Sequence, residues 1–119
     1  MSVIDIDREL TVLDGRHRLH IRTLTSSPQA FEVAYTITPP LPDDSNEGMV
    51  LPHLEAIDDA GRTYDDGGGA FGPSDDGTRT EGTISVQPGL PRDVREVVLR
   101  FGLLTRDGGS EHELTVALT

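Results

Sequence analysis

The feature that most constrains the fold of this chain is a period-two alternation of apolar and polar residues, which recurs along much of its length. In the clearest example Phe31, Val33, Tyr35 and Ile37 alternate with Glu, Ala and Thr residues. Successive side chains of an extended strand point to opposite faces, so this period predicts half-buried β-strands. Similar alternation recurs in four further segments, residues 4–12, 17–24, 82–86 and 111–118.

Turn signals and local composition define the remaining segments. Asp14-Gly15 is a favoured hairpin dipeptide, and a similar turn is predicted at residues 107–109. Residues 50–57 indicate a strand near a sheet edge, because Pro52 cannot donate within a central ladder. Residues 94–104 fit either a helical face or a strand, and their valines and phenylalanine favour the strand.

These segments predict about seven or eight short strands and no long helix, a pattern typical of a β-sandwich or a small barrel. We expect an all-β fold, an immunoglobulin-like antiparallel β-sandwich, with residues 1–119 as a single domain. Residues 65–78 are rich in glycine and aspartate and are expected to form a long loop. The predicted core consists of alternating apolar residues: Leu19, Ile21, Phe31, Val33, Tyr35, Ile84, Val86, Leu99, Phe101, Leu114 and Val116.

The charge of the chain excludes several classes of function. Its formal net charge is -11, and all 10 of its basic residues other than histidine are arginines. Without lysine, neither Schiff-base catalysis nor a Walker-type phosphate loop is possible. Without cysteine, disulfides and thiolate chemistry are also excluded. An acidic surface repels polyanions, so we expect neither nucleic acid nor an anionic membrane as a partner.

The N-terminal residues carry no sign of export. They are acidic and lack the basic start and apolar stretch of a signal peptide. No apolar run approaches the ~20 residues that span a bilayer, so we expect no membrane insertion. The simplest expectation is a soluble cytoplasmic protein.

Two segments resemble a known group of proteins. One is the turn Asp58-x-x-Gly61-x-x-Tyr64, and the other is the strand that ends in Pro88-Gly89-Leu90-Pro91 and leads into residues 95–99. Over residues 54–104 the chain is similar to small uncharacterised immunoglobulin-like domains of the actinobacterial type. Val86 stands where an aromatic residue is expected. The resemblance implies a sandwich fold in a bacterial protein, with no established activity and no site residues.

Three aspartate pairs form the main candidate site. They lie within residues 58–77 and are Asp58, Asp59, Asp65, Asp66, Asp75 and Asp76. Calcium takes six to eight oxygen ligands, which flexible acidic loops can supply, so these residues are candidate Ca²⁺ ligands. Aspartate and glycine are also common turn residues for backbone reasons alone, and that interpretation is favoured. No other cofactor is expected.

The histidines and the hydroxyl residues suggest no catalytic site. His17 and His20 point to opposite faces if they lie on one strand, and His53 and His112 are isolated in the sequence. A zinc site would need three of them to meet without a local motif. No Gly-x-Ser-x-Gly elbow is present, so no catalytic residue is assigned.

Phe71 lies in a glycine-rich segment and is a candidate contact for a partner protein. The alternative is that its ring folds back over the core, since burying a phenylalanine contributes about 1.5–3 kcal/mol. We therefore predict a non-enzymatic interaction or accessory module with a protein partner, or one that self-associates through an edge strand or an outer sheet face. The alternative function is a calcium- or carbohydrate-binding module that uses residues 58–77. A hydrolase site assembled from distant residues is a third class.

Overall fold

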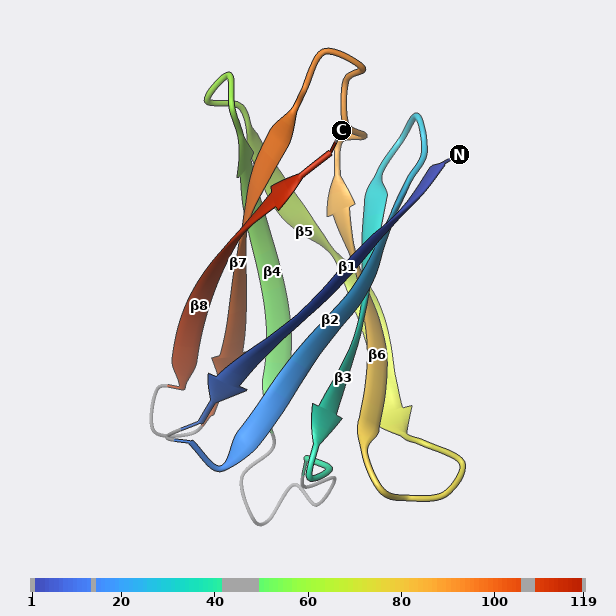
Figure 1. Cartoon of the computed structure of the whole chain (residues 1–119), viewed down its shortest axis with the longest axis vertical. Coiled ribbons are helices and arrows are strands. Elements are labelled where there is room, and N and C mark those ends of the chain that lie inside the picture. The colour runs from blue at the N-terminus through green and yellow to red at the C-terminus, as the bar shows by residue number, and fades with distance from the viewer. Residues whose placement is uncertain (1, 14, 42–49, 106–108, 119) are drawn as a thin grey trace.

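The computed structural model describes residues 2–13, 15–41, 50–105 and 109–118. It confirms an all-β fold of eight strands, and the described residues contain no helix. The strands are β1 (Ser2–Val12), β2 (His17–Ser26), β3 (Phe31–Thr38), β4 (Leu51–Asp58), β5 (Thr63–Pro73), β6 (Thr80–Gln87), β7 (Glu96–Leu104) and β8 (Ser110–Ala117). All neighbouring strands are antiparallel (Figure 1).

The strands follow one another in the order β1-β2-β3-β6-β5-β4-β7-β8. β5 connects the two parts of this arrangement. Only its first residues, Thr63 and Tyr64, pair with β4. The strand then leaves β4 and pairs with β6 as far as Pro73. At the two ends of the order, Cα atoms of β1 and β8 come within 8 Å of each other. The sheet therefore curls into a nearly closed, barrel-like form.

One apolar core fills the interior and receives side chains from all eight strands or from residues beside them. All eleven core residues predicted from the alternation are buried, which confirms that prediction. Two edge-to-face ring pairs cross the core: Phe31 with Tyr64, at 5.5 Å between centroids, and Tyr35 with Phe101, at 5.0 Å. Such pairs favour one relative position of the strands that carry them.

β5 is where the structure differs most from the expected fold. The prediction of a long loop over residues 65–78 is wrong for residues 65–73, which belong to the strand Thr63–Pro73, and is confirmed for residues 74–78, which connect β5 to β6. Glycine-rich sequence weakens a strand on its own. Here β6 provides a ladder from Asp65 to Pro73, interrupted by one register shift between Asp66 and Gly68, where Gly68 adopts φ +98°. The strand predicted in residues 94–104 is confirmed as β7.

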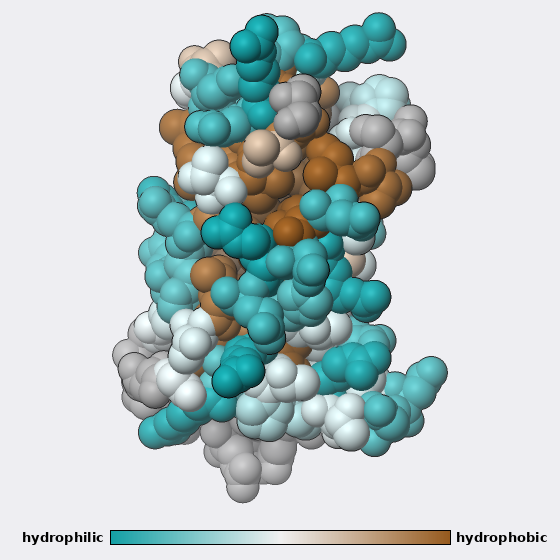
Figure 2. All heavy atoms as spheres, viewed as in Figure 1, coloured by the Kyte–Doolittle hydropathy of each residue, from teal (hydrophilic) through white to brown (hydrophobic). Residues whose placement is uncertain are grey.

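No helix in the described parts of the chain has the length and hydrophobicity needed to cross a membrane. The face shown in Figure 2 is mostly hydrophilic, with hydrophobic atoms in its upper half.

Candidate functional site

Asp58 forms the centre of the turn between β4 and β5. Its carboxylate is fully buried, and its Oδ1 accepts hydrogen bonds from the backbone N–H groups of Ala60, at 2.9 Å, and Arg62, at 3.0 Å. Its Oδ2 accepts from Nε of Arg62 at 2.8 Å and from the hydroxyl group of Tyr64 at 2.7 Å. Gly61 adopts φ +85°, a conformation that glycine reaches without strain. The Asp-x-x-Gly-x-x-Tyr sequence therefore supplies the carboxylate, the glycine and the hydroxyl group that form this turn.

The same hydrogen bonds determine the charge state of the turn. Burial disfavours the ionised carboxylate, but the bonds from Tyr64, Arg62 and Ala60 outweigh that effect and lower the pKa of Asp58 to about 2. Burial and the bond to Asp58 raise the pKa of Tyr64 to about 12. Asp58 is therefore a charged structural group whose four hydrogen bonds occupy its oxygens.

Asp59 and Asp66 also serve the backbone. Oδ2 of Asp59 accepts a hydrogen bond from the N–H group of Arg95 at 3.3 Å, which ties the turn to the start of β7. Oδ2 of Asp66 accepts from the N–H group of Leu54 on β4 at 3.1 Å, and its Oδ1 accepts from Gly68 at 2.6 Å. The Asp66 side chain thus continues the contact between β4 and β5 beyond their last backbone pair.

Asp75 and Asp76 lie at the other end of the molecule, in the connection from β5 to β6 (Figure 1). Asp76 accepts hydrogen bonds from the hydroxyl groups of Ser74 and Thr78, both at 2.7 Å, and from the N–H group of Thr78 at 3.1 Å. The bonds from Ser74 and Thr78 hold the pKa of Asp76 well below its usual range. Asp75 is exposed.

The six candidate aspartates therefore do not form one site. One group lies beside the β4–β5 turn, and the other lies beyond the far end of β5. In residues 2–13, 15–41, 50–105 and 109–118, no three histidine, aspartate or glutamate side chains are grouped so that they could hold a metal ion. Three of the six carboxylates, those of Asp58, Asp66 and Asp76, accept a hydrogen bond from the backbone N–H group two residues later, which is local turn geometry.

The histidines are also dispersed. Nε2 of His20 lies 2.6 Å from Oδ1 of Asp7, at a bulge in β1, and Nδ1 of His17 lies 2.8 Å from the carbonyl oxygen of Pro39. His112 contacts the hydroxyl group of Ser110. Each of these three imidazole rings thus contacts a different residue, and none of the contacts brings two histidines together.

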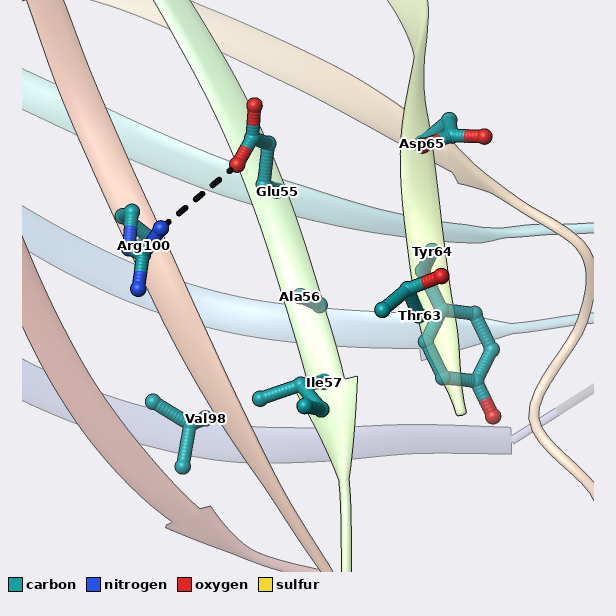
Figure 3. Close-up of a pocket in the computed structure, with 8 residues that line it drawn as sticks. All are labelled: Glu55, Ala56, Ile57, Thr63, Tyr64, Asp65, Val98 and Arg100. Atoms are coloured by element: carbon teal, nitrogen blue, oxygen red, sulfur yellow. Dashed lines mark ion pairs between the residues drawn. The ribbon is translucent and has the colours of Figure 1, made fainter. Parts of the chain in front are cut away.

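A pocket of about 300 Å³ lies on the outer side of β4, between β5 and β7. Its lining residues are Glu55, Ala56, Ile57, Thr63, Tyr64, Asp65, Val98 and Arg100. Figure 3 shows Glu55 and Arg100 turned toward each other and Asp65 pointing away from them. The guanidinium group of Arg100 lies 3.0 Å from a carboxylate oxygen of Glu113, 3.5 Å from one of Glu111 and 3.9 Å from one of Glu55.

Arg100 and the carboxylates around it dominate the charge at the pocket. The hydrogen bond and charge of Glu113, with the charges of Glu111 and Glu55, raise the pKa of Arg100, so its cation is permanent. The hydroxyl group of Tyr64 is already donated to Asp58. The lining also contains the hydroxyl group of Thr63 and the carboxylates of Glu55 and Asp65, and it contains no serine, cysteine or histidine.

The second half of β5 has an open edge, formed by residues 68–73. β6 pairs with one side of this segment, and within the described residues no strand pairs with its other side. Backbone groups of alternate residues in an antiparallel strand point away from the neighbouring strand. All but one residue of the open edge are exposed. A row of unpaired backbone groups is a template for another strand.

The facing edge of β4 is protected, in contrast to that of β5. The N–H group of Leu54 points away from β7 and is taken by Asp66. Alternate residues share this direction, and two residues earlier stands Pro52, which has no N–H group. Prolines and inward-pointing charges are devices that prevent strand pairing at an edge. The open edge has only Pro73 at its end and no charged residue.

Among the residues that the structure describes, no close packing contact requires glycine at two positions of β5. A Cβ atom at Gly69 would lie 2.1 Å from the carbonyl oxygen of Thr83, so glycine is required there. At Gly72 nothing lies within 4 Å of such an atom, and the backbone does not adopt a positive φ. At Gly67 only the flexible side chain of Gln87 is near. Glycine within a strand often marks close approach by another backbone.

Phe71 stands in the middle of the open edge and remains 43% exposed. It pairs with Gly82, which pairs with the buried Tyr35 of β3. A Cβ atom at Gly82 would lie 2.5 Å from the Tyr35 hydroxyl oxygen and 2.9 Å from Cβ of Phe71, so these residues fill one row. The ring therefore covers the core only in part. Its contact with a partner stays a prediction.

Sequence reasoning identified Phe71 but not the edge that carries it. A glycine run bounded by Asp66 and Pro73 has the composition of a loop, and its strand conformation depends on β6. The sequence signal that could have indicated a strand is the apolar pair Ala70-Phe71 within the glycine run, because these residues pair with β6.

No protein-family model matches this chain, and no curated protein matches it. In structure the chain is similar to a protein described as "The crystal structure of the conserved domain protein from Bacillus anthracis", with a TM-score of 0.62 and 13% sequence identity. The likeness covers 100% of this chain and 50% of that one, so this chain spans about half the length of its structural neighbour. At this identity the likeness concerns the fold alone.

Proposed function

We propose that this chain is an immunoglobulin-like β-sandwich domain that acts as a non-enzymatic interaction module. It binds an extended segment of another protein by strand addition along the open edge of β5. The sandwich is supported by the strand order: β1-β2-β3-β6-β5 and β4-β7-β8 share one core, and among the described residues the backbone pairing between these two groups is limited to the short β4–β5 ladder.

The single observation that carries the proposed activity is the open edge. Residues 68–73 combine unpaired backbone groups with a half-exposed aromatic ring at Phe71. In β-strand addition, main-chain hydrogen bonds supply affinity and alternate side chains supply specificity. The facing edge on β4 is blocked at Pro52 and Leu54, and parts of β1 and β8 approach each other, whereas the edge of β5 combines unpaired backbone groups with an exposed aromatic ring among the described residues.

The test is selection of binders from a random peptide library, followed by measurement with two blocking variants. Gly72→Lys puts a charged side chain on the edge where the fold has open space, and Phe71→Ser removes the ring. Val3→Lys and Val3→Ser are matched controls, because Val3 is 62% exposed on β1.

The proposal predicts that selected peptides bind the wild-type protein and both Val3 variants. Binding should fall by at least about tenfold in each β5 variant. Thermal unfolding of each variant verifies that it is folded. Selected peptides that bind the β5 variants as well as they bind wild type would contradict strand addition.

A further inference from the structure

We infer, on the basis of the proposed strand addition, that the segment bound at β5 has an apolar centre and basic residues at both ends, and that it belongs to a partner protein rather than to a second copy of this chain. The inference adds the chemistry of the partner to the proposed function. It depends on the distribution of charge along β5 and around it.

Carboxylates bound the open edge at both ends, and no charge lies between them. Asp65 and Asp66 precede it, and Asp75 and Asp76 follow it. At the far end Arg79 pairs with Glu81 at 2.9 Å, and its charge also acts on Asp76, but Asp75, Asp76 and Glu81 together leave this end acidic. With about 3.3 Å per residue, the ten residues from Asp66 to Asp75 span roughly 30 Å, so a partner strand of about nine residues with long basic side chains at its ends reaches both acidic ends.

The carboxylates that hold the turns remain charged when a partner arrives. Asp76 is kept ionised by its hydrogen bonds from Ser74 and Thr78, and its side chain lies at the surface. Asp65 is exposed, and no described residue forms an ion pair or hydrogen bond with its side chain. Opposite charges across neighbouring strands are favourable, and like charges are unfavourable. Arginine or lysine at each end of an added strand would therefore be favoured.

A second copy of the chain is the wrong occupant for the same reason. If two β5 strands paired antiparallel, residues 65–66 of one copy would lie beside residues 74–76 of the other, so acidic groups would meet at both ends. A parallel pair would also place each acidic end beside its own equivalent. Each copy carries a formal charge of -11, which adds to the repulsion.

The centre of the edge selects for a large apolar side chain. Phe71 is bordered on its own face by Gly69 and on β6 by Gly82, neither of which has a side chain. The ring is therefore accessible from the open side. An aliphatic or aromatic residue of the partner can cover Gly69 and contact the ring, as cross-strand pairs do.

The test uses four synthetic peptides of about nine residues. Three share a centre of alternating valine and threonine and carry arginines, serines or glutamates at both ends. The fourth has arginine ends but a proline-glycine centre that cannot form a strand. Affinities for the folded protein are measured by calorimetry at about 50 mM and about 500 mM sodium chloride.

The expected order of affinity at low salt is arginine ends, then serine ends, then glutamate ends. The first and last should differ by at least about tenfold, and high salt should reduce the difference. Gly72→Lys and Phe71→Ser should weaken the arginine-ended peptide, whereas Val3→Lys, which has the same net charge as Gly72→Lys, should bind it like wild type.

The contrary outcomes are distinguishable. Equal binding of the three valine-threonine peptides, still lost in the β5 variants, overturns the basic partner and leaves strand addition standing. Absence of binding by all three overturns strand addition as well. Binding of the proline-glycine peptide as tightly as its valine-threonine counterpart shows surface electrostatics only and overturns the inference. A dimer in sedimentation equilibrium that Gly72→Lys dissociates identifies a second copy as the occupant and overturns it too.

Discussion

The hydroxyl group of Tyr64 donates a 2.7 Å hydrogen bond to Oδ2 of the buried Asp58 carboxylate. This bond connects the β4–β5 turn to the core, because the ring of Tyr64 packs edge-on against Phe31. The turn in turn sets where β5 leaves β4, since the two strands pair only at Tyr64 and Thr63. The geometry of the open edge therefore depends on this contact.

Tyr64→Phe removes the hydroxyl group and keeps the ring. The free energy of unfolding should fall by about 1–3 kcal/mol, the range for a hydrogen bond to a charged group. Urea denaturation measures the change. Thr63→Val, at the exposed neighbouring position, is the control and should stay within about 0.5 kcal/mol of wild type. An unchanged midpoint for Tyr64→Phe would show that the contact does not stabilise the turn.

Because the pKa of Asp58 is low in the folded protein, the free energy of unfolding depends on pH in the acidic range. Its folded-state pKa of about 2 lies below the ordinary value of 3.8, so its contribution is complete above about pH 4 and is lost as the pH falls through about 2. The contribution is about 2 kcal/mol at neutral pH. Unfolding curves between about pH 2 and pH 7 test this for wild type and Asp58→Asn.

The difference in unfolding free energy between the two proteins should shrink as the pH falls, because the variant lacks the ionisable group. Asp58→Asn should be less stable at neutral pH, since its amide cannot accept all four hydrogen bonds. A difference that stays constant over the whole range would contradict the assigned pKa.

Two glycines of β5 should respond differently to alanine. Gly69→Ala places a methyl group 2.1 Å from the Thr83 carbonyl oxygen and should lower the free energy of unfolding by about 1–3 kcal/mol. Gly72→Ala meets open space and should change it by less than about 0.5 kcal/mol. Thermal or urea unfolding compares the pair. Equal effects would indicate that β5 does not hold its present register on β6.

Calcium should give no specific stabilisation. The candidate aspartates are divided between two ends of the molecule. Three of the six, Asp58, Asp66 and Asp76, already accept two or more hydrogen bonds from groups of the protein. A ligand at 100 times its dissociation constant would add about 2.7 kcal/mol, a shift of several degrees in Tm. We expect equal Tm values in calcium and magnesium at matched ionic strength. A rise specific to calcium would restore the metal-site hypothesis.

Much of the fold could be predicted because the alternation of apolar and polar residues is strong in strands that pair along their length with strands on both sides. β3, with Phe31, Val33 and Tyr35 on its inner face, is the clearest case. The turn at Asp58 was also predictable, since its Asp, Gly and Tyr residues lie close together in the sequence.

Other features depend on contacts between distant segments and leave no local pattern. β5 becomes a strand because β6 pairs with it, and its glycines show no alternation. The role of Asp66 depends on Leu54, twelve residues earlier. The edge of β5 is open because no described strand pairs with it, and this can be seen only when the strand order of the whole sheet is known.

The most direct test of the account is amide hydrogen exchange of the protein alone and with the arginine-ended valine-threonine peptide at saturation. Added main-chain hydrogen bonds should slow exchange in residues 68–72, while β1 and β8 stay unchanged. Slowed exchange confined to another strand, or to the outer face of β4 and β7, would contradict strand addition at β5.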